Sequence, residues 1–560
     1  ASTYMPLQLP QPQTYNFSAL VSSIEQGQIK IPQFQRDFVW TIQKSAGLID
    51  SIIKGYPIGT FIFWRTKERL RSVRDIGGQV LPEPVAGEFV DYVLDGQQRL
   101  TSLFASLKGI NLVRENGKKD DFSKIFIDLE AEDSNQIVIT ETEGKSQTSL
   151  ISILDLLDGD FIKLAAYPKK YHNKITTYKN RIESYQYSVI QVKDAPIDIA
   201  TEIFTRINVG GKPLSLFEIM VAKTYDHGRE FDLSEKFQDL VESLKPLDYE
   251  TISDATVLQT ISIIVSKECT RKNILKIDKN DFINAWDQAV DAIQRTVEYF
   301  RNSYRIPVSQ LLPYNALIVP FSYFFYHHND KPTDNKQKFL EDFFWRCSLS
   351  GRYSSAVESK LSQDIKRIDK IIDGELPSYD WSVDTSEEFI KNNGWFSAAR
   401  SYIKAILCVY AYAQPKSFND NSIVNISNYW LKQANSKNYH HFFPKSYLKK
   451  KGYENFRINH ILNITIVDDF LNKREIGAKA PSNYMGKFQS NSHLETTMQT
   501  HFIEDLKSFG IWDDDYDRFF DERAKVVSRE LSEKIIKQEI DGMGQSNLVD
   551  DFEEEATTTE

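Results

Sequence analysis

The sequence predicts an α+β fold whose second half is mainly helical, and three observations support this prediction. In the first 225 residues, strand-like apolar runs and helical periodicities mix without a strict β–α–β alternation. Residues 226–430 carry long helical periodicities. Around residues 461–474, a strand-like run is followed by a sequence that can begin a helix. With 560 residues and 41% hydrophobic content, the chain can bury a large core, and we expect two or three domains.

The first predicted helix and strand follow one another between residues 41 and 64. Thr41 can cap a helix that runs to Lys54, because apolar residues recur on one of its faces, and Gly55 can end it. Residues 60–64 are rich in aromatic and β-branched side chains, which predicts a strand. The charged residues 65–84 predict a loop or a hairpin.

A strand, a tight turn and a helix are predicted between residues 92 and 107. Asp95-Gly96 breaks the strand, and a helical pattern of apolar residues follows from Gln98. Unpaired N–H groups and the helix dipole then point at one spot, which suits an anion. Arg99 can contact a phosphate through two nitrogens, and Asp95 can hold a metal ion or orient a water. Both Gln97 and Gln98 can donate and accept. The alternative is an ordinary Asp-Gly turn.

The remaining elements are predicted from periodicity alone. We expect residues 331–338 to form a polar loop, and the dense aromatic residues between 314 and 326 to fill a helical core rather than to stack bases. Strands are expected at residues 125–129, 137–141 and 187–192, and helices at residues 171–185, 255–265, 282–300, 398–413, 499–509 and 516–539.

Composition narrows the class of protein. The formal net charge is −10, and six acidic residues lie between Asp550 and Glu560, so overall charge does not indicate a nucleic-acid-binding protein. Residues 542–560 are charged and poor in apolar side chains, which predicts a disordered tail; the alternative is a DNA mimic that occupies a basic surface. Three distant cysteines fit a reducing cytoplasm. The polar start and the lack of an apolar run of about 18 residues predict neither a signal peptide nor a membrane span.

The most readable chemistry lies between residues 438 and 481. The pair His440-His441 is followed by Pro444, by Asn463 in a strand-like run, and by Asn472 in a sequence that can begin a helix. This pattern resembles a His-Me finger (HNH) nuclease site, in which a β-hairpin and a helix hold one divalent metal ion against a phosphodiester. A chance histidine pair on the surface or in the core is the alternative.

Phosphodiester hydrolysis explains these residue types. The reaction needs a base that activates water and a cation that takes up the developing negative charge. The resemblance implies that His441 is the base, since imidazole titrates near neutral pH, and that Asn463 braces the loop that carries it. His440 and Asn472 would hold Mg²⁺ or Mn²⁺ through neutral donors and leave positions for water and phosphate.

Basic side chains are concentrated in the same segment. Residues 437–487 contain ten Lys and Arg against four Asp and Glu, a formal charge of +6. Such a segment predicts contacts to DNA phosphates, although a solvated surface is the alternative. The expected DNA-binding residues are Lys445, Lys449, Lys450, Lys451, Lys473, Arg474 and Lys479.

Three stretches of the amino-terminal half together resemble one family. They are Gln35-Arg36, Asp95-Gly96-Gln97-Gln98-Arg99, and the run of residues 204–215 that contains Arg206 and Asn208. The family is the GmrSD-type amino-terminal domain, which has a ParB/sulfiredoxin-like fold and occurs in modification-dependent restriction enzymes and SspE-like phage-defence nucleases. The resemblance implies nucleotide hydrolysis and sensing of DNA modification, with these residues binding nucleotide or phosphate. Gly210-Gly211-Lys212 is not a P-loop, since Pro213 follows and the upstream glycine is missing.

The sequence therefore predicts a cytoplasmic phage-defence endonuclease in four parts. Residues 1–228 would bind and hydrolyse an NTP, with GTP as one candidate, and sense modified DNA. Residues 229–430 would form a helical linking domain, residues 431–541 a ββα-metal (HNH) nuclease with trailing helices, and residues 542–560 an acidic tail. The expected partners are DNA, an NTP and a second copy of the chain, without a membrane. Two alternatives stay open: a regulatory DNA- or nucleotide-binding protein with an inactive finger, and an RNA-cutting toxin.

Overall fold

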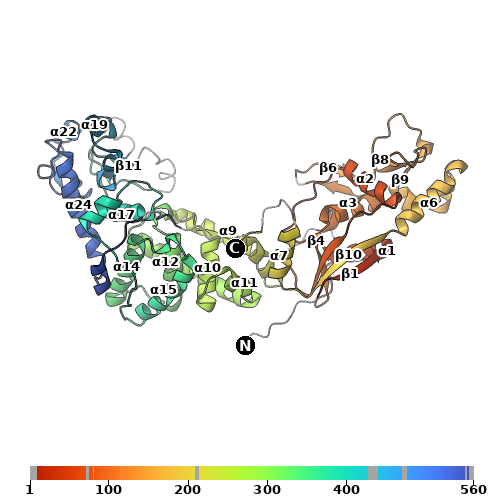
Figure 1. Ribbon diagram of the computed structural model, residues 1–560, viewed down its shortest axis with the longest axis horizontal. Coiled ribbons are helices and arrows are strands. Elements are labelled where there is room, and N and C mark those ends of the chain that lie inside the picture. The colour runs from red at the N-terminus through yellow and green to blue at the C-terminus, as the bar shows by residue number, and fades with distance from the viewer. Residues whose placement is uncertain are drawn as a thin grey trace. The chain divides into compact units, whose positions relative to one another are not determined.

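The computed structural model of the chain describes residues 9–70, 75–79, 81–114, 116–207, 214–226, 228–426, 439–468, 476–548 and 551–553 (Figure 1). The chain forms two compact units, which divide between Leu233 and Ser234. The first unit mixes strands and helices and the second is mainly helical, so the mixed α and β composition predicted from the sequence is confirmed. Within the described ranges, no helix is both long enough and apolar enough to cross a membrane.

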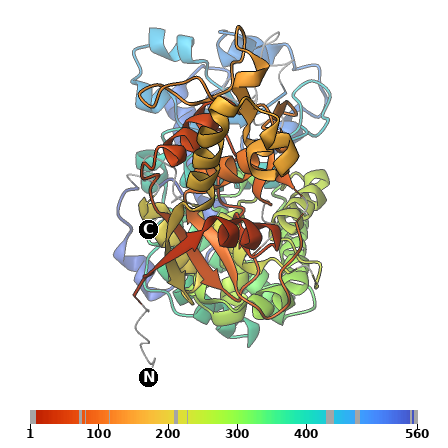
Figure 2. The same ribbon diagram turned by 90° about the vertical axis from the view of Figure 1, so that its right-hand side faces the viewer.

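A five-stranded mixed sheet is the framework of the first unit (Figure 2). Two neighbouring pairs of strands run parallel and two run antiparallel. In the antiparallel pair β3–β4, Asp95 lies opposite Ile62, so the turn after β4 lies beside the start of β3. The strand order is β1 (Gln11–Asn16), β10 (Gln186–Lys193), β3 (Phe61–Thr66), β4 (Val90–Asp95) and β2 (Ile29–Lys30).

Helices pack on this sheet and share its core. The predicted helix after Thr41 is present, because the Thr41 hydroxyl accepts a hydrogen bond from the N–H of Lys44 and caps the helix. Its apolar face packs against the helix that follows β4, and both contribute to one hydrophobic core with the sheet. The main helices are α1 (Phe17–Glu25), α2 (Ile42–Ile53), α3 (Gln97–Lys108), α6 (His172–Glu183), α7 (Ile197–Ile207) and α8 (Leu216–Thr224).

Two small sheets complete the first unit. The strands predicted at residues 125–129 and 137–141 are confirmed, and they join a third short strand. These two strands are β7 (Phe126–Asp128) and β8 (Val138–Ile139), and β7 also pairs with β9 (Leu150–Ser152). The second small sheet pairs β5 (Asn111–Val113) with β6 (Lys119–Asp121).

Helices with an aromatic core make up most of the second unit. Phe300, Phe321 and Phe344 lie in mutual ring contact, with centroids 4.9 to 6.0 Å apart, and all three are buried. The aromatic residues between 314 and 326 therefore fill a core, as predicted. The helices are α9 (Leu233–Leu244), α10 (Asp254–Ser266), α11 (Arg271–Lys276), α12 (Lys279–Asn302), α13 (Ile318–His327), α14 (Asp334–Leu349), α15 (Val357–Ile372), α16 (Glu387–Asn393) and α17 (Ser401–Tyr412).

The carboxy-terminal part of the second unit contains the histidine pair. We call residues 439–468 the finger segment. Helix α17 contacts it directly, since the Tyr410 hydroxyl donates to the Ile461 carbonyl (3.0 Å). The regions predicted separately as residues 229–430 and 431–541 thus lie in one unit. Its elements are β11 (Tyr439–His441), α19 (Lys445–Lys450), α20 (Asn455–Ile458), β12 (Ile464–Ile466), α22 (Pro481–Gly486), α23 (Leu494–Gln499) and α24 (Tyr516–Glu533).

Three predicted boundaries are wrong. Residues 500–510 form turns and irregular chain instead of a helix over residues 499–509. Phe502 and Gly510 have φ values of 59° and 72°, which interrupt a right-handed helix, although the apolar side chains between them are buried. The apolar pattern there reflects burial and not helical period. Helix α24 ends at Glu533 instead of residue 539, and α14 begins at Asp334, inside the predicted polar loop.

The predicted disorder of residues 542–560 is also wrong for the residues described there, 542–548 and 551–553. The Asp551 carboxylate accepts from Nε of Arg400 (2.8 Å) and from the N–H of Tyr402 (3.0 Å). Glu553 accepts from the N–H groups of Asn315 and Ala316, both at 2.9 Å. Acidic side chains here satisfy the N–H groups that begin helical segments. The low hydrophobicity of this segment predicts disorder, because hydropathy does not reveal the hydrogen bonds and the ion pair that hold it.

Candidate functional site

A short antiparallel pair of strands positions the two adjacent histidines. In β11 and β12, His440 lies opposite Thr465 and His441 lies opposite Ile464. Successive residues of a strand point to opposite faces, so the two imidazoles leave the strand on different sides. His440 is buried, with its ring centroid 6.1 Å from that of Tyr484, whereas His441 is only partly buried. His441 is the more accessible of the pair.

Asn463 closes the loop that follows His441. Its buried side chain accepts from the N–H of Phe443 (2.8 Å) and donates to the carbonyls of Phe443 (2.9 Å) and Ile458 (3.1 Å). The N–H of Phe442 also donates to the Asn463 carbonyl (2.7 Å). An amide that is satisfied at both its oxygen and its nitrogen fixes the chain on either side. This is the geometry that the predicted bracing role requires.

Asn459, which the sequence did not single out, holds the His441 ring. Nε2 of His441 lies 2.8 Å from Oδ1 of Asn459, whose Nδ2 donates to the Phe396 carbonyl (3.1 Å). Because an amide oxygen only accepts, Nε2 carries the proton and Nδ1 keeps its lone pair. The neutral ring is thus in the tautomer whose Nδ1 can take a proton from water. In the sequence, Asn459 is only a polar residue ahead of an apolar run.

Burial determines the protonation state of His441. It lowers the pKa of the imidazole to about 4; the hydrogen bond with Asn459 opposes this shift and the charge of Lys445 adds to it. The ring is therefore neutral at pH 7, as a general base must be before the reaction. A phosphate bound beside the ring would raise this pKa, since an anion favours the imidazolium.

Two further histidines of the second unit have structural roles. Nδ1 of His460 accepts from the N–H of Leu462 (3.1 Å), and its Nε2 bonds to the Lys391 carbonyl (2.9 Å). His501 bonds to the Lys416 carbonyl (2.7 Å). Burial lowers the pKa of each to about 4. Both rings form hydrogen bonds with backbone groups, whereas the ring hydrogen bond described for His441 is with the Asn459 side chain.

Exposed lysines follow the histidine pair on α19. Lys445, Lys449, Lys450 and Lys451 are all exposed, and none of their ammonium groups forms a hydrogen bond or ion pair with the residues that the structure describes. Only Lys451 has a specific neighbour, the Tyr447 ring, whose centroid lies 5.7 Å from Nζ. These ammonium groups are available to an external anion. Lys479 is partly buried, and Lys473 and Arg474 lie outside the described residues.

The predicted metal ligands are described only in part. His440 is in β11, and Asn472 lies outside the described residues. Across the described ranges, no three His, Cys, Asp or Glu side chains gather as a metal site would require. An imidazole at His440 and an amide at residue 472 suit a hard cation that keeps most of its ligands as water and phosphate. Of the two predicted ligands, the described ranges contain only the buried His440, and they contain no closed, zinc-type site.

Arg523 of α24 supports the same loop from the other side. Its Nη1 donates to the carbonyls of Leu462 (2.8 Å) and Ile464 (2.6 Å), and its Nη2 donates to the His501 carbonyl (3.1 Å). The guanidinium is buried against the Tyr410 ring (4.7 Å). Three carbonyls and an aromatic face thus take the place of a carboxylate partner. Arg523 positions the residues on either side of Asn463, and its place in a predicted helix gave no signal of this role.

In the first unit, a left-handed glycine makes the turn between β4 and α3. Gly96 has a φ of 93°, and a Cβ atom there would lie 2.5 Å from the Phe61 ring. Both facts require glycine. The first N–H groups of α3, beginning at Gln97, have no acceptor within the helix. Strand, turn and helix are therefore placed as the sequence predicted.

Three glutamines hold the loop of residues 36–40 against this turn. Gln98 donates to the Asp37 carbonyl (2.9 Å) and accepts from the N–H of Val39 (2.9 Å). Gln97 donates to the Arg36 carbonyl (3.3 Å). Gln35 donates to the carbonyls of Val93 (2.8 Å) and Leu94 (3.1 Å) at the end of β4. The first two predicted motifs are thus brought together, and their amides serve to join the backbone segments.

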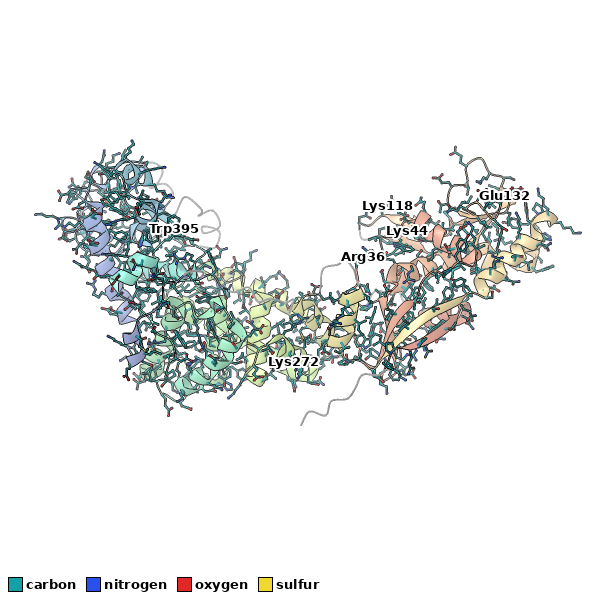
Figure 3. All side chains as sticks on the ribbon, viewed as in Figure 1. Arg36, Lys44, Lys118, Glu132, Lys272 and Trp395 are labelled. Atoms are coloured by element: carbon teal, nitrogen blue, oxygen red, sulfur yellow. The ribbon has the colours of Figure 1, made fainter. Side chains whose placement is uncertain are left out.

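Arg99 and Arg36 differ in what their guanidinium groups contact. Arg99 donates to the carbonyls of Ile58 (2.8 Å) and Thr60 (2.9 Å) and stacks on Phe61. Its predicted phosphate contact therefore remains a prediction that competes with two hydrogen bonds. The Arg36 side chain is exposed, and its guanidinium forms no hydrogen bond or ion pair with the described residues (Figure 3). The Asp95 carboxylate is 47% exposed, with one oxygen 3.7 Å from Nη2 of Arg99.

The third predicted motif is described only at its beginning. The Phe204 ring lies 5.1 Å from the Phe34 ring, so α7 packs beside the loop that carries Gln35 and Arg36. Arg206 is exposed and paired with Glu202 (2.8 Å) on its own helix. Asn208 lies outside the described residues. The structure thus brings the start of this motif to the first two.

A pocket of about 420 Å³ lies beside α3. Gln97 and Thr101 of α3 line it together with Asp37 and Arg114. Arg114 is held between the Phe38 and Phe122 rings (4.9 and 5.8 Å) and is paired with Asp120 (2.8 Å). The pocket is large enough for a small organic ligand. Its mixed carboxylate and guanidinium lining suits hydroxyl and ring groups more than phosphates.

Comparison with known proteins gives two matches. Residues 17–225 match the family model described as the GmrSD restriction endonuclease N-terminal domain. The chain is also similar to the uncharacterized protein MJ0686 of Methanocaldococcus jannaschii, with 25% identity over 605 aligned positions, which cover 93% of this chain and 99% of that protein. The family match includes Gln35, Arg36 and residues 95–99, so it falls on the turn and loop described above.

Proposed function

We propose that this chain is a phage-defence restriction endonuclease. In this proposal the first unit binds and hydrolyses an NTP and senses modified DNA, and the finger segment of the second unit cuts DNA with a divalent metal ion. The family match over residues 17–225 supports the restriction class. The match to MJ0686 over nearly its whole length supports both units as parts of one protein.

One observation supports cutting more than any other: His441 is a neutral, oriented base next to a braced loop. Asn459 fixes the proton on Nε2, and Asn463 fixes the backbone that follows the ring. Phosphodiester hydrolysis needs a group that removes a proton from water, and Nδ1 of His441 is free to accept it in this tautomer. The exposed lysines of α19 would hold the phosphates of the strand beside the base.

The metal would supply charge neutralisation at the scissile phosphate. His440 and Asn472 would hold it, as the sequence predicts. The residues of this chain would do the rest: His441 takes the proton, Asn459 keeps the ring in place, and Arg523 and Asn463 keep the loop from moving. The fit with Mg²⁺ or Mn²⁺ follows from donors that are neutral and few.

The first unit would bind nucleotide at the turn after β4. Asp95 and Arg36 are the exposed charged groups there, and the pocket beside Gln97 would take the nucleoside part. A nuclease that acts on DNA in its own cell must be controlled. Nucleotide or modified DNA can provide that control only if it binds the active state more tightly than the inactive one.

Cutting and NTP turnover, measured on the same preparations, test the proposal. The wild-type protein should cut DNA only with Mg²⁺ or Mn²⁺, and His441→Ala should abolish cutting while NTP turnover persists. Asp95→Ala should abolish NTP turnover, while the finger segment keeps its metal affinity. Substrates would be plasmids with unmodified, phosphorothioate and glucosylated DNA, and RNA of the same sequence.

Each of the other functions predicts a different result. Metal-independent DNA binding without any cutting would support a regulatory protein with an inactive finger. Cutting of RNA alone would support the toxin. Wild-type cutting rates in His441→Ala would remove His441 from the mechanism, and loss of metal binding in Asp95→Ala would mean that the two sites are one.

A further inference from the structure

Two exposed aromatic rings of the second unit are not used in the proposed chemistry. Trp395 and Phe456 are 38% and 42% exposed, and their rings stack with centroids 6.3 Å apart and planes 13° apart. Trp395 is the one exposed tryptophan among the residues that the structure describes (Figure 3). Single exposed apolar side chains are common, but a stacked aromatic pair forms a larger apolar surface that water solvates poorly.

The pair is connected to His441 through the backbone. Trp395 bridges His460 in antiparallel fashion, and the N–H of Phe396 donates to the Asn459 carbonyl (3.0 Å). The Phe396 ring centroid lies 6.4 Å from that of His441. Successive residues of an extended segment have Cα atoms about 3.8 Å apart and point to opposite sides. The Trp395 ring therefore leaves the segment on the opposite side from the Phe396 ring, and its Cα lies one residue step from that of the residue that contacts the candidate base.

The charges around the rings favour an anionic strand with flat, uncharged parts. Two nearby carboxylates are paired, Asp517 with Arg457 (2.6 Å) and Asp521 with Lys391 (2.7 Å), and the exposed Glu454 lies two residues before Phe456. Helix α20, which carries Phe456, packs against α19 with its exposed lysines. A nucleic-acid strand presents the matching pattern, with phosphates for the lysines and a base for the rings.

We propose that Trp395 and Phe456 form a stacking platform for one unpaired nucleobase of the substrate strand, next to the nucleotide whose phosphate is cut. This inference rests on the proposed function, because it requires a nucleic-acid substrate. A base that stacks on protein rings has left its own duplex stack, so the platform takes a flipped or single-stranded base. Stacking fixes the position of the strand against His441 without reading base identity.

The test combines side-chain changes with substrates that lack one base. Full-length protein would be measured without divalent metal, using fluorescent oligonucleotides in which an abasic residue is moved along the strand. Trp395→Leu removes the aromatic face but keeps an apolar side chain, and Trp395→Phe keeps an aromatic face. We expect Trp395→Leu to weaken binding roughly 5- to 150-fold, since base–aromatic stacking contributes about 1–3 kcal/mol. Tyr412→Leu, at an exposed aromatic residue of the same unit, is the matched control.

The abasic substrates distinguish stacking from a general structural effect. One abasic position should weaken binding of the wild-type protein and of Trp395→Phe but have no further effect on Trp395→Leu. Equal losses at that position in all three proteins would overturn the platform, as would wild-type affinity in Trp395→Leu. If the wild-type protein neither binds nor cuts any nucleic acid, the proposed function fails first. If the wild-type protein cuts normally and Trp395→Leu binds with wild-type affinity, the platform is contradicted and the proposed function is not.

Discussion

Two arginines near the turn after β4, Arg36 and Arg99, differ in what their side chains contact. The Arg99 guanidinium donates to two carbonyls of the loop before β3 and stacks on Phe61, whereas the Arg36 guanidinium has no partner among the described residues. The sequence suggests a phosphate-binding role for both, for Arg99 because it follows the Asp95-Gly96 turn and for Arg36 because of the family resemblance. Their contacts separate a residue that holds the fold from one that is available to a ligand.

We therefore expect opposite results from replacing the two arginines. Arg36→Ala should leave the free energy of unfolding within about 0.5 kcal/mol of wild type and weaken NTP binding roughly 10- to 100-fold. Arg99→Ala should destabilise the first unit by about 2–3 kcal/mol, because two charge-assisted hydrogen bonds are lost. Urea unfolding and nucleotide titration of both variants check this. Full stability in Arg99→Ala would contradict it.

Buried histidines should make the second unit sensitive to acid. Burial lowers the pKa of His441, His460 and His501 to about 4 each, below the value near 6.5 of an unfolded chain. Between these values the unfolded state binds more protons, so stability is fully present above about pH 6.5 and is lost as pH falls toward 4. Asp342 acts the other way, since burial raises its pKa to about 6. Burial also lowers the pKa of His327 and raises that of Glu553, so the histidines outweigh the two carboxyls and leave a net loss on the order of several kcal/mol.

Urea unfolding at pH 7.5, 6 and 4.5 measures this loss. The unfolding midpoint of the second unit should fall at each step. His460→Gln should unfold at lower urea than wild type at pH 7.5 and show a shallower pH dependence, because one of the three groups is gone. A midpoint that stays constant from pH 7.5 to 4.5 would show that these rings are not held neutral.

At the scale of elements, α19 should act as a charged surface for phosphate. Replacing Lys449, Lys450 and Lys451 together with Gln should weaken DNA binding for all sequences alike. The slope of log affinity against log salt should become shallower by up to about 2.7, roughly 0.9 for each lost contact. Binding titrations from 50 to 300 mM salt give this slope.

A matched control separates local contacts from a general change in charge. Lys272, which Figure 3 labels, and Lys276 and Lys338 are exposed in the same unit and lie on α11 and α14. Their triple replacement with Gln changes the net charge by the same amount and should leave the slope unchanged. Equal slopes in the two triple variants would mean that α19 is only a solvated face.

The carboxy-terminal segment should behave as a structural element. Asp551 neutralises the buried Arg400 and accepts from the first turn of α17, and Arg400 in turn donates to the Trp395 carbonyl (2.6 Å). Asp551→Ala should lower the stability of the second unit by about 3 kcal/mol, because a buried cation loses its partner. Thermal unfolding checks this, with Asp513→Ala at an exposed carboxylate as control. An equal Tm in the two variants would show that the contact between Asp551 and Arg400 does not stabilise the second unit.

At the scale of the whole molecule, the chain is two compact units that carry different candidate chemistry. The turn after β4 and its pocket belong to the first unit, and the histidine pair, its lysines and the aromatic pair belong to the second. The contacts described for each of these sets join residues of the same unit. The variants above should therefore change one activity at a time, apart from any regulation between the units.

The sequence by itself determined most elements whose signals are local. Thr41 and the apolar face behind it determine α2, Asp95-Gly96 ends β4, and the adjacent His440 and His441 mark the finger segment. Local signals mislead where burial comes from a distant part of the chain. The apolar residues between 502 and 509 are buried without a helix, and the acidic residues Asp551 and Glu553 are bound by N–H groups and, for Asp551, by Arg400.

Only the tertiary structure decided which polar side chains hold the fold and which remain available. Asn459, Arg523 and Trp395 carry no sequence signal, because their partners are backbone groups and rings that lie far away in the chain or are brought close by a turn. Hydrogen bonding and burial depend on three-dimensional distance, which residue types and spacing do not specify. For the same reason, one role is predicted from the sequence for both Arg36 and Arg99, and only the positions of the loops around β4 show that their contacts differ.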